Sequence, residues 1–529
     1  MKGLTGWELR PAQEEAVRRI NVAFESGKKI VAVQGPTGSG KSLIGLETAL
    51  AHPLSYYLVP LKALQDQIAK DFATKMNVFK GKSNYLCTQY TKYQTTVDKA
   101  PCQERSKEST AQRKECRENQ LCNYYNALEQ AQKGPHTLMN FTLFLCWMRI
   151  RNESPLLAPF LQRPLHIIDE AHNIEGFVRD FLSIQLSSES IKKYLDLKEF
   201  PGIGSTDDQI KTFLVSLEKR NKDELEDLKK VYGPNLAAVA SEINDNKLDF
   251  HLTLEGKLEM FLDDRDNYGF GHENRFNYQT KKHQDYILAK PLKVGGFIRD
   301  NLLGERTLLM SATLPQKAVS AMGFKDEEFE YIDLPSTFPA KNRLIKFASV
   351  GRINQTNSES LVPKMAIEVN KVLTRFPEAK GIIHSPSYRL AELLFKAVAS
   401  DRLILQEREP GAAMRALKSH TESPHPTVLL TPGMKEGVDL KDDLSRFQII
   451  LKAPYPSLGD PAVKKLAKEN HAWYITRTLV DFMQMYGRSI RSADDYAETI
   501  ILDDNMRALL VQYKTWVPKY VMEAVRWVG

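Results

Sequence analysis

Short, mainly apolar runs recur along the chain, and each leads into a glycine-rich or polar segment. They occupy residues 30–33, 165–168, 308–310, 381–383 and 428–430. Runs of this length without regular polar alternation are typical of strands that are buried on both faces of a parallel sheet. A helical spacing of apolar residues follows one of them, at residues 389–398. The pattern predicts an α/β fold built on parallel sheets.

The length of the chain and one long interval between these runs indicate several domains. At 529 residues the chain exceeds what a single hydrophobic core supports. Residues 174–300 are too many for a loop, and residues 217–233 place Leu217, Leu225 and Leu228 on a charged, helix-like background. We expect a second α/β unit from residue 341 and an amphipathic helix in the tail, at residues 505–529.

The first apolar run leads into a glycine-rich loop of defined spacing. Its eight residues match G-x-x-x-x-G-K-[ST] and are Gly35, Pro36, Thr37, Gly38, Ser39, Gly40, Lys41 and Ser42. Between a strand and a helix, such a loop presents backbone N–H groups to phosphates. We expect Lys41 to reach the β- and γ-phosphates of a nucleotide and Ser42 to bind Mg²⁺. A chance glycine-rich turn is the alternative interpretation.

Two carboxylates follow the strand predicted at residues 165–168. Asp169 and Glu170 begin the sequence Asp-Glu-Ala-His. An acid at the carboxyl end of a strand can hold Mg²⁺ opposite a phosphate loop, and its neighbour can polarise the attacking water. We expect Asp169 in the first role and Glu170 in the second. The alternative, an acidic helix start favoured by the helix dipole, is disfavoured because the four residues follow a strand in this order.

Three further stretches complete the set of motifs. They are Ser-Ala-Thr at residues 311–313, Glu-Gly-Val-Asp at residues 436–439, and residues 484–491, which contain Gln484, Arg488 and Arg491. Arginines three residues apart share one face of a helix. Two guanidinium groups aimed at a γ-phosphate can act as arginine fingers. A solvated helix face is the commoner reason for this spacing, but the flanking Gln484 and Gly487 favour the catalytic interpretation.

Composition and charge indicate an ordinary globular protein. Hydrophobic residues make up 42% and charged residues 26% of the chain, and the net charge of +7 mildly favours a polyanionic partner. The first residues lack the apolar run of a signal peptide, and no run of 18 apolar residues predicts a membrane span. Five cysteines without a secretory signal indicate reduced thiols or metal ligands. We therefore expect a cytoplasmic protein that does not contact membranes.

The ordered motifs resemble those of superfamily 2 helicases and cover most of the chain. Residues 10–13 resemble the element in which a glutamine, here Gln13, reads adenine, and residues 59–67 resemble the segment that touches the DNA backbone. Because Arg10 already begins this element, we expect no fused nuclease before it. The cysteines between residues 59–67 and the Asp-Glu-Ala-His sequence are similar in placement to those of the iron–sulfur helicases of the XPD/DinG type. Further segments that resemble this type are residues 82–87, 122–125, 136–141, 335–339 and 452–456, with Asn123 in place of the usual proline.

The resemblance implies two RecA-like motor domains with parallel sheets, interrupted by two insertions. Motor domain 1 would comprise residues 1–78, 131–173 and 301–340. An iron–sulfur domain would occupy residues 79–130, a mainly helical arch-like insertion residues 174–300, and motor domain 2 residues 341–529. By the same resemblance, Gly437 and Asp439 would contact the nucleotide.

Four of the five cysteines lie within one stretch of 36 residues, 87–122. Cys87, Cys102, Cys116 and Cys122 are separated by 14, 13 and 5 residues, without the close pairs usual for zinc. Four thiolates match the ligands of a [4Fe–4S] cluster, which the resemblance also implies. Zinc is the alternative, and a set of inert buried thiols is disfavoured by the polar surroundings. Cys146 lies in an apolar run and is expected in the core.

Much of the positive charge falls between residues 80 and 117. Nine lysines and arginines against four acids leave +5 of the chain's +7 in this segment. Tyr85, Tyr90 and Tyr93 are interleaved with these charges. A basic groove with aromatic side chains is typical of single-strand binding, where stacking contributes about 1–3 kcal/mol per base. A solvated charged surface is the alternative for any one lysine.

Together with the motifs, the resemblance implies an ATP-dependent DNA helicase. It would move 5′ to 3′ along single-stranded DNA and unwind duplexes, with ATP, Mg²⁺ and a [4Fe–4S] cluster as cofactors. Single-stranded and forked DNA would be its partners, DNA repair or replication its setting, and a monomer its working form. An ATP-driven translocase that remodels protein–DNA or RNA-containing complexes is the alternative. A non-catalytic module that uses ATP as a clamp is disfavoured by Glu170, Arg488 and Arg491.

Overall fold

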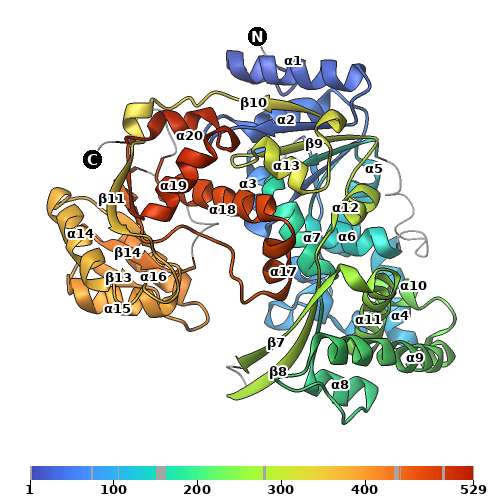
Figure 1. The fold of residues 1–529 in the computed structure, drawn as a ribbon. Coiled ribbons are helices and arrows are strands. Elements are labelled where there is room, and N and C mark those ends of the chain that lie inside the picture. Colours follow the sequence, from blue (N-terminus) through green and yellow to red (C-terminus); the bar gives the residue numbers. More distant parts are fainter. Residues whose placement is uncertain are drawn as a thin grey trace.

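The computed structural model contains two parallel sheets and a small antiparallel sheet, with helices on both faces of the larger sheets (Figure 1). It describes residues 3–72, 75–104, 106–150, 163–277, 281–433, 440, 442–490 and 495–527. Within these ranges no helix combines the length and the apolar character needed to cross a membrane. The two parallel sheets confirm the expected α/β fold.

The first sheet has seven parallel strands in the order β10-β1-β9-β5-β2-β4-β3. The strands are β1 (Ile30–Gln34), β2 (Ser55–Val59), β3 (Asn77–Val78), β4 (His136–Asn140), β5 (Leu165–Ile168), β9 (Arg306–Ser311) and β10 (Phe329–Asp333). One face packs against α1 (Pro11–Glu25), α2 (Lys41–Leu50) and α3 (Lys62–Asp71). The other face packs against α6 (Phe141–Ile150), α12 (Gly295–Asn301) and α13 (Gln316–Ala321). Burial on both faces explains why the strand sequences are almost continuously apolar.

The second sheet has six parallel strands in the order β11-β16-β15-β12-β14-β13. These are β11 (Ile345–Gly351), β12 (Gly381–His384), β13 (Leu403–Leu405), β14 (Val428–Thr431), β15 (Phe447–Ile450) and β16 (Glu498–Asp503). The accompanying helices are α14 (Val362–Arg375), α15 (Tyr388–Val398), α16 (Ala412–Glu422), α17 (Pro461–Glu469), α18 (His471–Tyr486), α19 (Asp504–Gln512) and α20 (Lys519–Ala524). The expectation of one tail helix is wrong, because a 3₁₀ turn at Lys514–Trp516 and Pro518 separate α19 from α20.

The cysteine-rich segment leaves the first sheet after β3 and returns at β4. Four short 3₁₀ turns lead into α4 (Lys107–Glu118), which is followed by α5 (Asn123–Lys133). Ser106 caps α4 by accepting a hydrogen bond from the backbone N–H of Ser109. The expectation that Cys146 lies in the core is wrong. Its neighbours Phe144, Leu145 and Trp147 on α6 are buried, whereas Cys146 occupies the exposed face of that helix.

A second insertion lies between β5 and β9 and is mainly helical, as expected. Its elements are α7 (Ile174–Leu182), β6 (Ile184–Ser187), α8 (Ser188–Leu195), α9 (Asp207–Tyr232), α10 (Leu236–Glu242), α11 (Asn246–Asp263), β7 (Tyr268–Asn277) and β8 (Lys282–Pro291). The helix expected at residues 217–233 lies within α9. The long hairpin of β7 and β8 was not predicted. Two glycines in β7, Gly269 and Gly271, lower its strand propensity and conceal it in the sequence.

The hairpin packs against α17, which directly precedes α18 in the second half of the chain. A Cβ atom on Gly269 would lie 2.7 Å from the carbonyl oxygen of Pro461, so only glycine allows this approach. At the base of the hairpin, Lys290 Nζ lies 2.6 Å from Asp460 Oδ2. The two glycines therefore serve a contact between elements that are almost 200 residues apart along the chain.

Candidate functional site

The glycine-rich loop joins β1 to the amino end of α2, as the sequence predicts. Gly38 and Gly40 have φ values of 78° and 79°, which an L-residue rarely adopts. Gly40 is the residue directly before α2, so the loop turns into the helix at a point where unpaired backbone N–H groups face outward. Lys41 Nζ donates a hydrogen bond to the carbonyl oxygen of Gly35 at 3.1 Å. The lysine side chain thus lies over the loop that would bind a phosphate.

Gln13, expected to read adenine, is buried against this loop. Its side-chain Nε2 donates to the carbonyl oxygen of Ser39 at 3.0 Å, and its Oε1 accepts from the backbone N–H of Arg10 at 2.9 Å. Arg10 also donates to the carbonyl oxygen of Gly38 at 2.9 Å. In this structure the Nε2 end of the Gln13 amide therefore braces the phosphate loop, while its Oε1 end caps the start of α1.

Asp169 follows the end of β5 and faces the first turn of α2. Its Oδ2 accepts a hydrogen bond from the hydroxyl of Tyr57 at 2.9 Å and lies 3.5 Å from Ser42 Oγ. Its Oδ1 accepts from the backbone N–H of Glu170 at 2.9 Å. Ser42 and Asp169 are therefore brought together as expected for a shared cation. The contribution of Tyr57 was not predicted, because no motif marks that strand position.

Glu170 is held in a strained backbone conformation with a φ of 50°. Its Oε2 accepts from the Ser311 hydroxyl at 3.3 Å and lies 3.4 Å from His172 Nδ1. Left-handed geometry is unusual for a glutamate and is retained only where the surroundings determine it. Ser311 and His172 fix the direction of the carboxylate.

The two adjacent acids have opposite pKa shifts. Burial, followed by the nearby charge of Glu170, raises the pKa of Asp169 to about 6. Burial also acts to raise the pKa of Glu170, but the hydrogen bond with His172 and the charge of Lys41 outweigh it and lower that pKa below its usual range. Glu170 is therefore ionised at neutral pH and can accept a proton, as a water-activating base must.

A polar network connects this site to α18 from the second half of the chain. His172 Nδ1 lies 2.7 Å from Ser311 Oγ, and His172 Nε2 lies 2.9 Å from Gln484 Nε2. Gln484 also donates to Thr313 Oγ1 at 2.5 Å. Residues of three separate motifs are therefore hydrogen-bonded to one another here. The sequence motifs predicted no role for His172.

Arg488 lies in the same region, but the expected helical face of two arginines is wrong. The helix α18 ends at Tyr486, with Gly487 as its C-cap, so Arg488 lies in the turn that follows. Arg488 is buried, and its guanidinium donates to Gln484 Oε1 at 3.3 Å. Arg491, Gly437 and Asp439 lie outside the described residues.

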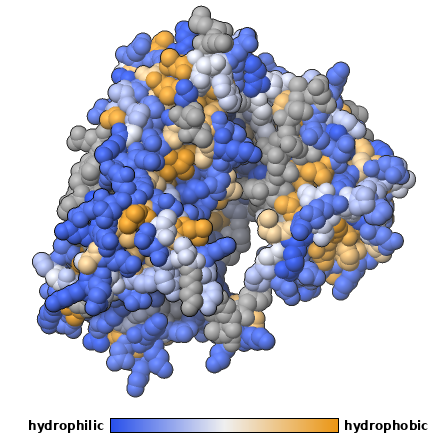
Figure 2. Space-filling view, turned by 180° about the vertical axis from the view of Figure 1, so that it is seen from behind, coloured by the Kyte–Doolittle hydropathy of each residue, from blue (hydrophilic) through white to orange (hydrophobic). Residues whose placement is uncertain are grey.

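These groups surround a cleft of about 480 Å³. Its lining includes Thr37, Gly38, Gly40, Lys41, Ser42, Asp169, Glu170, Gln484 and Arg488. Gln13 lies against the loop through its hydrogen bond to Ser39, and Gly35 and Pro36 precede these lining residues along the loop. The space-filling view from behind shows a deep notch that separates the smaller lobe from the rest of the molecule (Figure 2). Residues from both halves of the chain therefore line one nucleotide-sized cleft.

The four cysteines of residues 87–122 lie near one another. Burial and the proximity of Cys102, Cys122 and Cys87 raise the pKa of the Cys116 thiol to about 11. The Cys87 sulfur accepts a hydrogen bond from the backbone N–H of Tyr90 at 3.3 Å. The Cys102 sulfur accepts one from the side-chain amide of Gln103 at 3.4 Å. Over the described part of the chain, no group of three or more acidic, histidine or cysteine side chains is arranged to hold a metal ion.

Arg113 fixes the loop that bears Cys102. It is buried, and its guanidinium donates to the carbonyl oxygens of Cys102 at 2.5 Å and Glu104 at 3.3 Å. Arg113 and Cys116 lie on α4, so one helix both supplies a thiol and positions the loop with another. The donor set is four thiols, with N–H groups directed at two sulfurs, and its chemistry is that of a sulfur-ligated cluster, whose binding would have to displace the proton of Cys116.

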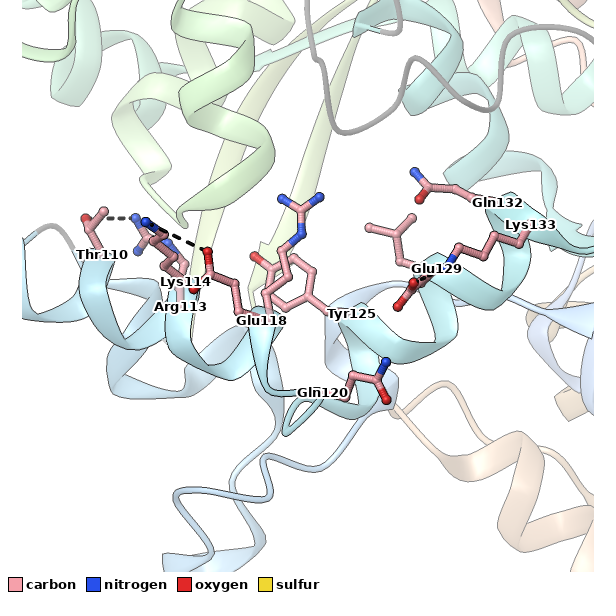
Figure 3. Close-up of a pocket in the computed structure, with 11 residues that line it drawn as sticks. Thr110, Arg113, Lys114, Glu118, Gln120, Tyr125, Glu129, Gln132 and Lys133 are labelled. Atoms are coloured by element: carbon pink, nitrogen blue, oxygen red, sulfur yellow. Dashed lines mark hydrogen bonds and ion pairs between the residues drawn. The ribbon is translucent and has the colours of Figure 1, made fainter.

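A groove of about 700 Å³ runs between α4 and α5 on the same insertion (Figure 3). Its lining includes the cations Arg113, Lys114, Arg117 and Lys133 against the acids Glu118 and Glu129. The Arg117 guanidinium lies 5.9 Å from the centre of the Tyr125 ring. Figure 3 shows Lys114 and Lys133 on different helices along the groove. A concave surface whose exposed cations are Lys114, Arg117 and Lys133 can accept a phosphate backbone.

Comparisons with known proteins agree with this architecture. Residues 371–524 match the family model of a helicase C-terminal domain, and residues 6–199 match that of the res subunit of type III restriction enzymes. The chain is 20% identical to the ATP-dependent DNA helicase YoaA of Haemophilus influenzae, over 96% of this chain and 92% of that protein. It is 22% identical to the protein of the same name from Escherichia coli, over 96% and 93% of the two chains.

Two solved structures share the fold along almost their full lengths. An XPD helicase superposes with a TM-score of 0.61 at 18% identity, over 96% of this chain and 98% of that one. Xpd4 of S. tokodaii superposes with a TM-score of 0.56 at 14% identity, over 98% and 100%. These two structures show the shared fold. The two domain matches, the relatives named as DNA helicases and the cleft built from ordered motifs identify the chain as an ATP-hydrolysing superfamily 2 helicase of the XPD/DinG type.

Proposed function

We propose that this protein uses ATP hydrolysis to move along single-stranded DNA in the 5′ to 3′ direction and to unwind duplexes. The observation that carries the proposal is the cleft in which Lys41 and Glu170 of the first half face Gln484 and Arg488 of the second. Because one nucleotide would contact both halves, its binding and hydrolysis can close and reopen the cleft. The relatives named as DNA helicases support DNA as the substrate.

In the cleft, each residue has a distinct proposed role. The phosphate loop of residues 35–42 would bind the β- and γ-phosphates, with Lys41 as the main cation. Ser42 and Asp169 would hold Mg²⁺, which neutralises phosphate charge when bound. Glu170 would accept the proton of the attacking water, since its pKa is lowered and its carboxylate is oriented by Ser311 and His172.

Closure of the cleft would complete the site. Gln484 is already linked to His172 and Thr313 across the two halves. We propose that Arg488 moves from Gln484 towards the γ-phosphate when ATP binds and stabilises charge in the transition state. Gln13, Gly437, Asp439 and Arg491 are proposed as further nucleotide contacts. The resemblance and the motif spacing support this, and Gln13 would have to exchange one of its present hydrogen bonds for adenine.

The insertions would serve the DNA strand. We propose that Cys87, Cys102, Cys116 and Cys122 bind a [4Fe–4S] cluster, which would cross-link the segment when bound. The basic groove of Figure 3 would guide the strand by its phosphates, without reading its sequence. The division into motor domain 1 (1–78, 131–173, 301–340), iron–sulfur domain (79–130), arch-like insertion (174–300) and motor domain 2 (341–529) remains part of this proposal, as does a monomer that acts on forked DNA.

The direct test is strand displacement with duplexes that carry either a 5′ or a 3′ single-stranded tail, in DNA and in RNA. We expect displacement of the 5′-tailed DNA duplex with ATP and not without it. ATP turnover stimulated by DNA, with no displaced strand from any substrate, would instead favour the alternative of a translocase that remodels protein–DNA or RNA-containing complexes.

The role of the cysteines is tested by Cys102→Ser, with Cys146→Ser as the matched control. Loss of one of four ligands should release iron and loosen the segment between Cys87 and Cys122. Because the cleft is built from other residues, ATP turnover should partly survive while strand displacement fails. Cys146 is exposed and lies outside the four-thiol group, so its substitution should leave iron content and displacement unchanged. Zinc without iron in the wild type would overturn the cluster assignment, and normal displacement after iron loss would show that unwinding does not need it.

A further inference from the structure

Strand β2 contains two adjacent tyrosines that are buried on opposite faces of the first sheet. Tyr56 is 2% exposed and packs on the side of Phe144, whereas Tyr57 is 0% exposed and packs with α1 and α2. Alternation along a strand requires this opposite orientation. Only Tyr57 therefore points toward the helix that follows the phosphate loop.

The Tyr57 hydroxyl is a fixed donor to one oxygen of Asp169. The distance from Tyr57 Oη to Asp169 Oδ2 is 2.9 Å, and the second oxygen, Oδ1, accepts from the Glu170 backbone at 2.9 Å. A tyrosine hydroxyl has a usual pKa of about 10 and is therefore protonated at physiological pH, so it donates to the carboxylate. Two donors, one to each oxygen, fix the orientation of the carboxylate.

The neighbouring helix leaves space for this tyrosine. Gly45 lies in the interior of α2, where glycine costs about 1 kcal/mol relative to alanine. A Cβ atom at Gly45 would lie 2.9 Å from Tyr57 Cε2 and 2.6 Å from Met310 Cε. Because real Cβ atoms do not approach so closely, glycine at this position lets the Tyr57 ring and the Met310 side chain pack directly against α2.

We propose that Tyr57 is a positioning residue for the nucleotide–Mg²⁺ site, and that it acts by holding the carboxylate of Asp169. This inference rests on the proposed role of Asp169 as a Mg²⁺ ligand. Mg²⁺ demands near-octahedral geometry, and residues that orient a ligand typically change metal affinity or activity by about 10–100-fold. Tyr57 itself would not touch the nucleotide.

The test compares Tyr57→Phe with the wild type, Asp169→Asn and Tyr56→Phe. Two quantities are measured: the Mg²⁺ concentration that gives half-maximal ATP turnover, and the binding of a fluorescent ADP analogue with and without Mg²⁺. We expect Tyr57→Phe to need about tenfold more Mg²⁺ in both assays. Its turnover at saturating Mg²⁺ and its Mg²⁺-free ADP binding should stay near wild type. Tyr56→Phe also loses a buried hydroxyl from β2, but its Mg²⁺ dependence should not change.

The other outcomes distinguish a failure of the proposed role of Asp169 from a failure of the inference about Tyr57. If Asp169→Asn leaves the Mg²⁺ dependence unchanged, the proposed function of Asp169 fails. If Asp169→Asn shifts it and Tyr57→Phe does not, Asp169 stands and the inference about Tyr57 is overturned. Should Tyr57→Phe fail to fold, Gly45→Ala tests the same point, since its methyl group would displace the ring. A folded Gly45→Ala protein with wild-type Mg²⁺ dependence would likewise overturn it.

Discussion

At the scale of single residues, two neighbouring carboxylates acquire different properties from different partners. Asp169 is buried and has its pKa raised to about 6, whereas Glu170 is held ionised by His172 and Lys41. Asp169 is therefore suited to binding a cation, and Glu170 is suited to accepting a proton. The raised pKa of Asp169 also implies that this residue destabilises the protein when no cation is bound.

Asp169→Asn should therefore stabilise the nucleotide-free protein at neutral pH while it lowers ATP turnover at limiting Mg²⁺. The pKa of Asp169 is higher in the folded state, about 6, than the usual value near ~3.9, so the folded state binds the proton more tightly. The free energy of unfolding then falls as pH rises between these values, and the loss persists above them. Thermal unfolding should show the variant about 2 °C or more above the wild type at pH 7.5, with the difference gone near pH 4. A variant that unfolds at a lower temperature at both pH values would contradict this.

The sequence predicted the residues of the phosphate loop, Asp169, Glu170 and Gln484, because each lies in a motif of fixed spacing. It did not predict Tyr57 or the engagement of Gln13. Both depend on distances across the sheet, from β2 to β5 and from α1 to the loop, which no local spacing records. The turn at Arg488 was missed for a different reason, since Gly487 ends α18 inside a motif that was treated as one helix.

At the scale of elements, the parallel strands were predictable and the β7–β8 hairpin was not. Buried strands produce apolar runs that are visible in the sequence, whereas β7 alternates glycine with aromatic residues at residues 268–271. These glycines are explained only by α17, which is distant in the chain. Three buried residues with hydrogen bonds to one another lie beside the contact between the hairpin and α17. The Trp473 indole N–H donates to Glu175 Oε1 at 2.6 Å, and Arg179 donates to the same oxygen at 2.5 Å.

Gly269→Ala tests the closeness of β7 to α17. The added methyl group would lie 2.7 Å from the carbonyl oxygen of Pro461, so the two elements must separate. We expect a loss of about 1–3 kcal/mol in the free energy of unfolding, measured by denaturant titration. Gly296→Ala on α12 is the control, because nothing lies within 4 Å of its Cβ position. The contact is not tight if both variants unfold at the same denaturant concentration.

At the scale of the whole molecule, the two parallel sheets meet at one cleft and are also joined through the second insertion. In Figure 1, α18 runs between the second-sheet lobe and the elements of the first half. The same helix supplies Gln484 to the cleft and Trp473 to the buried group near α7 and β8. A change in the cleft can therefore be transmitted along α18 to the second insertion, which is the kind of coupling that an ATP-driven motor requires.

We propose above all that ATP hydrolysis in this cleft is coupled to the binding of single-stranded DNA. The most direct measurement is steady-state ATP turnover with and without single-stranded DNA, in the wild type and in Glu170→Gln, together with ATP binding by both. We predict that DNA stimulates the wild type, and that Glu170→Gln binds ATP normally but turns it over about 10²–10⁴-fold more slowly, because an amide cannot accept the proton of water. Wild-type turnover that is indifferent to DNA, or a variant that hydrolyses ATP as fast as the wild type, would contradict the account.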